Sequence, residues 1–177
     1  MFLYLAMIDS DADKSKFEIL YSEYKNLMYY TANRILRNSS DAEDVVHQAF
    51  LKVIEILDTI SSPRCHKTRA LLVTITEHKA IDLYREKQRR NVLPLAEEYI
   101  GAAPAAEIER LAERDTLAAA IASLPPRYRS VLLLRYDCGY SNAEIAKILD
   151  TTEPNVRKLI QRAKEKLSAQ LSGMEEP

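Results

Sequence analysis

Apolar side chains recur every three or four residues along most of the chain, at the spacing that places them on one face of an α-helix. In the first half, this pattern predicts three long amphipathic helices, from about Phe17 to Asn38, from Ser40 to about Leu57, and from about Thr68 to Arg89. Strand-like alternation bounded by turn residues is hard to find, and the chain has only three Gly. The sequence therefore predicts an all-α fold.

The stretch NVLPLAEEYIGAAPAAE, rich in Pro and small residues, interrupts the helical pattern and is typical of a linker. Beyond it, four shorter helices are predicted near residues 107–123, 126–136, 141–149 and 152–170. We therefore expect two small helical domains, with three helices within residues 14–90, a flexible linker over residues 91–106, and four helices within residues 107–171.

Residues 140–163, YSNAEIAKILDTTEPNVRKLIQRA, have the pattern of two short helices joined by a tight turn. Ser141 and Glu144 are expected to form a capping box at the start of the first helix, and Thr151 and Thr152 can cap the second. The outward positions of the second helix carry cations and amides, which neutralise phosphates and form bidentate bonds to base edges. This favours a DNA recognition helix, although the same residues also fit an ordinary helical hairpin with a solvated basic face.

Charge is distributed unevenly along a chain whose formal net charge is only -1. Ser40 and Glu43 are predicted to form a second capping box, and Asp41 and Asp44 lie where the helix dipole favours acids. Cations exceed acids in residues 64–90 and 127–177, whereas acids exceed cations in residues 1–63 and 91–126. This distribution suits a protein that touches DNA at two places and another partner elsewhere.

The sequence predicts no cofactor, metal site or membrane insertion. Cys65 and Cys138 lie far apart and are expected to be reduced thiols of a cytoplasmic protein. Cys65 and His66 lack the spaced second pair that a tetrahedral zinc site needs, and no glycine-rich phosphate loop is present. The apolar opening MFLYLAMI is too short to span a membrane, and we expect it to pack on the first long helix.

Three segments, DAEDVVHQAF, AIDLYREKQRR and LPPRYRSVLLLRYDCGYSNAEIAKIL, together resemble bacterial sigma-70 family RNA polymerase sigma factors of the two-domain, extracytoplasmic-function (ECF) type. The resemblance covers nearly the whole chain from Phe17 to Leu171. It implies a sigma region 2 domain, a sigma region 4 helix-turn-helix domain, and no enzymatic activity. Its implied partners are core RNA polymerase, through the largest and second-largest subunits, promoter DNA and an anti-sigma factor, with no small-molecule substrate.

The resemblance also implies roles for individual residues. The helix from Ser40 to Leu57 is expected to dock on a coiled coil of the largest polymerase subunit through Asp41, Glu43, Asp44 and Gln48. The next helix is expected to recognise the minus-ten element through His78, Lys79, Asp82 and Arg85, with the loop around Ser61 to Lys67 receiving an extruded base. The last helix is expected to bind the minus-thirty-five element through Thr152, Asn155, Arg157, Lys158, Gln161 and Arg162.

Several positions depart from the family pattern, and the promoter and polymerase contacts are expected to differ accordingly. The family commonly has Asn at the position of His78, Trp at Leu71, Gln and Glu at His47 and Gln48, and Gly and Arg at Pro154 and Leu159.

Two other functions fit parts of the sequence. An autonomous helix-turn-helix regulator would bind a palindromic operator tightly without polymerase, whereas a sigma factor would bind DNA feebly until polymerase is present. An enzyme would use the carboxylates of DAED with His47. Those acids lie in the first turn of a helix without a nucleophile, phosphate loop or metal set, so catalysis is not predicted.

Overall fold

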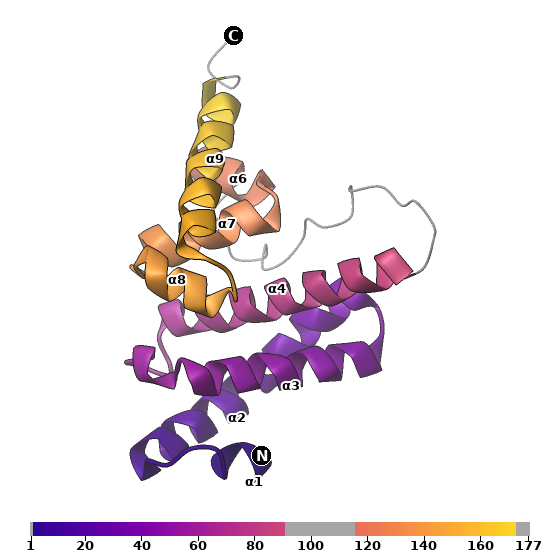
Figure 1. The fold of residues 1–177 in the computed structure, drawn as a ribbon, viewed down its shortest axis with the longest axis vertical. Coiled ribbons are helices and arrows are strands. Elements are labelled where there is room, and N and C mark those ends of the chain that lie inside the picture. The colour runs from indigo at the N-terminus through magenta and orange to yellow at the C-terminus, as the bar shows by residue number, and fades with distance from the viewer. Residues whose placement is uncertain (1, 91–115, 173–177) are drawn as a thin grey trace. The chain divides into compact units, whose positions relative to one another are not determined.

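The computed structural model describes residues 2–90 and 116–172, and the chain forms two compact units, Met1–Leu93 and Pro94–Pro177. Every regular element in the described ranges is a helix, so the all-α prediction is confirmed (Figure 1). The predicted linker over residues 91–106 lies outside the described residues, as does the start of the helix predicted near residues 107–123.

Three long helices form the first unit, with two short ones beside them. The long helices are α2 (Asp11–Leu36), α3 (Ser39–Glu55) and α4 (His66–Arg90); the short ones are α1 (Phe2–Leu5) and the 3-10 turn η1 (Leu57–Thr59). Figure 1 shows α3 and α4 side by side with α2 crossing both, and each of the three packs against the other two. Their shared core is apolar and includes Phe17, Leu20, Met28, Phe50, Val53, Leu71, Leu72 and Ile75. The three predicted long helices are therefore confirmed, although α2 begins at Asp11, after the N-cap Ser10, and not at the predicted Phe17.

The start of α3 differs from the prediction. Asn38, not Ser40, is the N-cap, and its side-chain Oδ1 accepts a hydrogen bond from the Asp41 N–H at 3.1 Å. Arg37 ends α2 in the left-handed conformation with φ 51°, and Asn38 follows in an extended conformation. Ser39 is therefore already helical, and the capping box predicted at Ser40 and Glu43 was wrong.

Four helices and a π-helical turn form the described part of the second unit. They are α6 (Thr116–Ser123), α7 (Pro126–Leu132), the π-helical turn η3 (Leu133–Asp137), α8 (Asn142–Ile148) and α9 (Glu153–Ser172). Helix α9 packs against α6, α7 and α8, burying Leu124, Tyr128 and Ala163 among others. This unit therefore holds α9 on a scaffold of three shorter helices.

The predicted capping box at the start of α8 is confirmed. The Glu144 N–H donates to Ser141 Oγ at 3.2 Å, and the Ser141 N–H donates to Glu144 Oε2 at 2.7 Å. Hydrogen bonding from the side chain of Ser141 and then from its backbone N–H to the carboxylate lowers the pKa of Glu144. They fix where α8 begins, and α8 in turn supports the turn that leads into α9.

Candidate polymerase and nucleic-acid interfaces

The outward face of α3 carries a stripe of exposed polar side chains. We define the α3 stripe as Glu43, Asp44, His47 and Gln48, all exposed, whereas Val45, Val46, Ala49 and Phe50 between them are buried. Residues three and four positions apart are neighbours on a helix surface, so the four side chains form one continuous patch. Three of the four residues predicted to bind polymerase lie in this patch.

Asp41, the fourth predicted polymerase contact, is engaged within the first unit. Its side chain is only 17% exposed, and Lys87 of α4 donates to both carboxylate oxygens at 2.5 Å. The pair joins the first turn of α3 to the last turns of α4, 46 residues away along the chain. A polymerase contact at Asp41 would therefore have to displace Lys87.

The four residues predicted for the minus-ten element lie on α4 with different exposures. Asp82 and Arg85 are exposed, and Lys79 is half-buried. His78 is half-buried, and its Nε2 is shielded from solvent without a hydrogen-bond partner among the described residues. Burial lowers the pKa of His78; the charge of Arg85 acts in the same direction, and that of Asp82 opposes it. The exposed part of this helix face is therefore formed by Asp82 and Arg85.

The loop before α4 is tied to the first turn of that helix. The Thr68 hydroxyl donates to the Ser62 carbonyl oxygen at 2.6 Å, and the Thr68 N–H donates to Cys65 Sγ at 3.4 Å. Arg64 lies 3.7 Å from a Glu23 carboxylate oxygen on α2. Exposed side chains remain both in the loop, at Ser61 and Ser62, and at the start of α4, at His66 and Lys67. The loop that is expected to receive an extruded base thus has a defined conformation.

All six residues predicted for the minus-thirty-five element are exposed, at the start of α9 and on its first half. Thr152 Oγ1 accepts a hydrogen bond from the Asn155 N–H at 3.4 Å, and the Asn155 side chain donates to Thr151 Oγ1 at 2.8 Å. Arg157 forms an ion pair with Glu153 at 2.5 Å. The beginning of α9 is therefore capped, and its cationic and amide side chains lie on an exposed surface.

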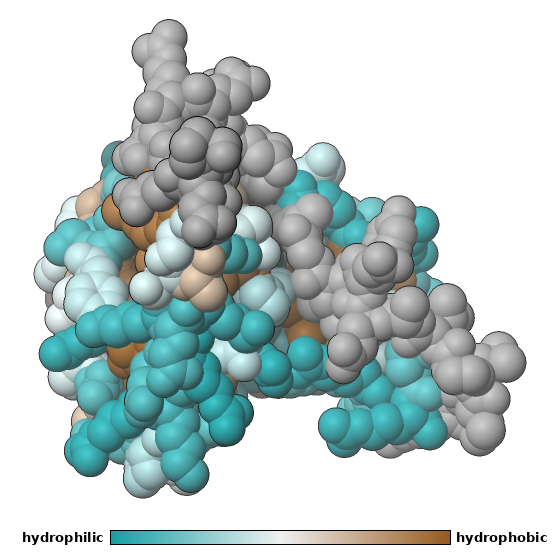
Figure 2. Space-filling view, turned by 90° about the horizontal axis from the view of Figure 1, so that it is seen from above, coloured by the Kyte–Doolittle hydropathy of each residue, from teal (hydrophilic) through white to brown (hydrophobic). Residues whose placement is uncertain are grey.

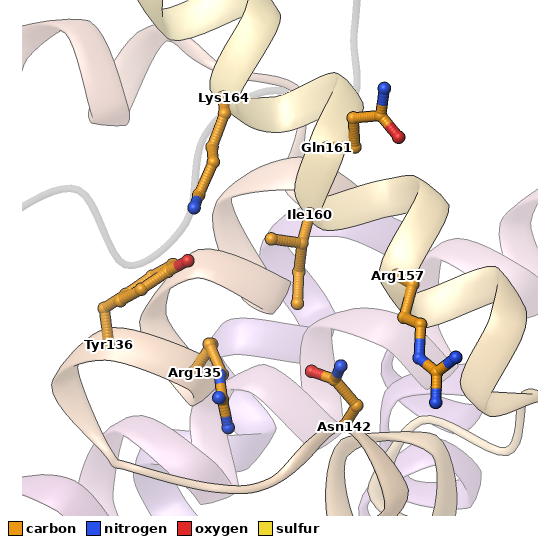
Figure 3. Close-up of a pocket in the computed structure, with 7 residues that line it drawn as sticks. All are labelled: Arg135, Tyr136, Asn142, Arg157, Ile160, Gln161 and Lys164. Atoms are coloured by element: carbon orange, nitrogen blue, oxygen red, sulfur yellow. The ribbon is translucent and has the colours of Figure 1, made fainter.

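A pocket of about 360 Å³ opens beside α9 (Figure 3). Its lining consists of Arg135, Tyr136, Asn142, Arg157, Ile160, Gln161 and Lys164. Three of these residues are cations and none is an acid, so the pocket favours an anion such as phosphate.

The π-helical turn η3 supplies one wall of this pocket, and π-helical turns are frequent at functional sites. Arg135 Nη1 donates to the Tyr140 carbonyl oxygen at 3.0 Å, which holds the guanidinium in place. Lys164 of α9 reaches toward Tyr136, with its Nζ 5.1 Å from the ring centroid (Figure 3). The Asn142 Oδ1 atom is buried and has no hydrogen-bond partner in the described ranges. The pocket is therefore formed jointly by η3, α8 and α9.

Comparisons with known proteins identify the family. Residues 20–90 match the family profile described as Sigma-70 region 2, and residues 114–167 match Sigma-70, region 4. The chain belongs to the sigma-70 family. The ECF RNA polymerase sigma factor SigW of Bacillus subtilis is 28% identical over 171 residues, covering 90% of each chain. SigL of Mycobacterium tuberculosis, also an ECF sigma factor, is 27% identical over 154 residues, covering 86% of each chain.

This sigma factor is thus of the ECF type. The alternative that the chain is an enzyme is rejected, because sigma factors are transcription initiation factors without catalysis of their own. In a solved structure of CnrH in complex with the cytosolic domain of CnrY, the matched chain is 26% identical to this one. The match covers 89% of this chain and 88% of that chain, with a TM-score of 0.39.

Across residues 2–90 and 116–172, no helix is long and apolar enough to cross a membrane. In the same ranges, no His, Cys, Asp and Glu side chains are grouped to hold a metal ion.

Sequence reasoning assigned no role to three residues of the pocket in this sigma factor, Arg135, Tyr136 and Asn142. It placed Lys164 on the outward face of the last helix but did not assign it to the minus-thirty-five element. Lys164 carried a usable signal, because it follows Arg157 and Gln161 at helical spacing on the same face of α9. Arg135 and Tyr136 carried none, since residues 126–136 were predicted as one regular helix and a π-helical turn changes the direction of the side chains that follow it.

Cys65 is expected to be alkylated at a lower pH than an ordinary thiol. Hydrogen bonding with Thr68, through its side chain and then its backbone N–H, lowers the pKa of Cys65, so its reactive thiolate persists further into the acidic range. The measurement is the pH dependence of the iodoacetamide reaction rate in a Cys138→Ser background. The Thr68→Val variant should shift this profile to higher pH, and an unchanged profile would contradict the role of Thr68.

Proposed function

We propose that this sigma factor binds core RNA polymerase and directs it to promoters by recognising minus-thirty-five and minus-ten elements. The proposal is carried by one observation. The region 2 unit exposes the α3 stripe with its two carboxylates, whereas the region 4 unit exposes the cations and amides of α9 beside a pocket lined by three cations and no acid. The region 2 domain would span residues 14–90, the linker residues 91–106 and the region 4 domain residues 107–171.

Polymerase docking is proposed for the α3 stripe. The exposed carboxylates of Glu43 and Asp44 favour a basic protein surface rather than DNA, because phosphates would be repelled. Gln48 adds amide hydrogen bonding on the same patch. The largest and second-largest polymerase subunits are the proposed partners. A negative net charge is compatible with promoter recognition because polymerase supplies part of the affinity for DNA.

Promoter recognition is proposed for two separate surfaces. Asp82 and Arg85 on α4, with the exposed residues of the tied loop before it, would contact the minus-ten element; Lys79 and His78 would contribute less because they are half-buried. The exposed side chains of α9 would enter the major groove at the minus-thirty-five element, where Lys158 and Arg162 neutralise phosphates and Asn155 reaches base edges. On the face drawn in Figure 2, hydrophobic residues are visible in patches between hydrophilic ones.

We also propose that this sigma factor acts in the cytoplasm, where polymerase and promoters are found. Its activity would be regulated by an anti-sigma protein. An anti-sigma protein would act by covering the α3 stripe or the α9 surface.

Arg135→Ala and Lys164→Ala are each expected to reduce the salt dependence of promoter binding. Log affinity falls linearly with log salt concentration, and removing one phosphate contact should lower the steepness of that line by about one. The measurement is the affinity of preassembled holoenzyme for a promoter fragment at several salt concentrations. Arg127→Ala, which removes an exposed cation of α7 outside the pocket, is the matched control. If the slope of log affinity against log salt concentration were the same for both variants as for the Arg127→Ala control, the pocket would not bind a DNA phosphate.

The direct test of the proposed function is run-off transcription from a genomic fragment library by bacterial core polymerase, with and without this protein. Discrete transcripts that require the protein would support the sigma role, and alignment of their upstream sequences would give the promoter elements. If no such transcripts formed and the isolated protein bound a palindromic operator tightly, the autonomous regulator would replace the proposal.

A further inference from the structure

Tyr4 of α1 contacts the centre of the α3 stripe. Its Oη lies 2.6 Å from Nδ1 of His47, 43 residues away along the chain, and the two ring centroids are 5.3 Å apart. Tyr4 is only 7% exposed and packs against the rings of Phe17, Tyr21 and Phe50. The predicted packing of the N-terminal segment on the first long helix is therefore confirmed. This segment also reaches a residue of the stripe that sequence analysis did not assign to polymerase.

The chemistry of this pair favours the phenol as the donor of the hydrogen bond, because a phenol O–H is a stronger donor than acceptor. Burial raises the pKa of Tyr4, so the phenol keeps its proton and its O–H is available as a donor. When the phenol donates to Nδ1, a neutral imidazole must carry its own proton on Nε2. His47 is exposed, so the edge of its ring opposite Nδ1 is accessible to a partner.

We infer that Tyr4 is a positioning residue, which holds His47 in the Nε2–H tautomer and in one ring orientation so that His47 donates a hydrogen bond to an acceptor on core polymerase. The inference rests on the proposed function, because it takes the α3 stripe as the docking surface. His47 lies one helical turn after Glu43 and Asp44 and next to Gln48, so it sits inside the patch.

Positioning matters here because an exposed imidazole samples several orientations and both neutral tautomers. Only part of that population presents an N–H outward, and binding must then restrict the ring at an entropic cost. The Tyr4 hydroxyl removes this cost before polymerase arrives. Packing of the N-terminal helix requires the aromatic ring at position 4 but not its hydroxyl. A substitution that removes only the hydroxyl therefore distinguishes a positioning role of Tyr4 from a purely structural one.

The first readout is the tautomer of His47 in the full chain, measured from the two ring nitrogen shifts by NMR at a pH where the ring is neutral. The wild-type protein should show the Nε2–H form, and Tyr4→Phe should show a mixture of both tautomers. Tyr21→Phe is the matched control, because it removes a hydroxyl from the same aromatic cluster without removing the bond to His47. It should leave the wild-type tautomer unchanged.

The second readout is affinity for core polymerase. Tyr4→Phe should weaken binding by about three- to tenfold, the usual effect of one hydrogen bond, whereas Tyr21→Phe should not. In a His47→Gln background, the side-chain amide has no second tautomer for Tyr4 to select against. Tyr4→Phe should then cause no further loss of affinity for core polymerase.

Tyr4→Phe with the wild-type tautomer or the wild-type affinity would overturn the inference. A wild-type chain that fails to bind polymerase at all would instead overturn the proposed function, and the NMR result would show separately whether Tyr4 fixes the tautomer of His47.

Discussion

Phe50→Ala is expected to lower the free energy of unfolding of the first unit by about 3 to 5 kcal/mol, the range found when a buried Phe is truncated. The Phe50 side chain has no exposed surface. Its ring centroid lies 4.9 Å from that of Tyr21, 5.7 Å from that of Phe17 and 5.9 Å from that of Tyr4. Truncation leaves a cavity beside rigid rings from α1 and α2, which cannot close it by small rotamer changes. Since domains of this size are marginally stable, the loss is a large fraction of the total.

Urea denaturation of the full chain, followed by a probe in each unit, measures this effect. The transition of the first unit should move to lower urea, whereas that of the second unit, which has its own core, should stay in place. Phe50→Leu is the control, because it keeps most of the volume and should cost clearly less. Equal losses for the two variants would contradict the cavity explanation, because Leu keeps most of the volume that Ala removes.

The positions of the helices along the chain were predictable because the buried residues of each helix recur at the same three- to four-residue spacing. In α2 and α3 the buried residues Phe17, Leu20, Val46 and Val53 recur at helical intervals, so the buried faces were visible in the sequence. The capping box at Ser141 was predictable because it depends on two residues three positions apart. The start of α3 was not, because it depends on the left-handed backbone of Arg37, a residue without the usual preference for that conformation.

Contacts between distant residues decide the details of the candidate site, and no local pattern reveals them. Asp41 has the same acidic character as Asp44, but Lys87 engages Asp41 from another helix. His47 is joined to Tyr4 from the N-terminal segment in the same way. The periodicity of α3 predicts which face is exposed, whereas the roles of individual side chains on that face depend on neighbours more than forty residues away.

Glu43→Lys combined with Asp44→Lys is expected to weaken binding to core polymerase by about a hundredfold or more. Both residues are exposed on the α3 stripe, so the substitutions leave the core of the first unit intact. They replace carboxylates with cations opposite a basic partner surface, and like charges brought together across an interface cost several kcal/mol. The loss should be largest at low salt and should shrink as salt screens the repulsion.

Two controls separate this effect from other causes. Asp11→Lys combined with Glu18→Lys makes the same change in net charge on exposed positions of a different helix, α2, and should weaken binding only slightly. Asp41→Asn should lower the affinity by less than about threefold, because a half-exposed ion pair contributes little and its carboxylate faces Lys87. The measurement is the dissociation constant of the labelled full chain from core polymerase at low and physiological salt. If the Glu43 and Asp44 reversals bound as tightly as the Asp11 and Glu18 reversals, docking would have to occur on a surface other than the α3 stripe.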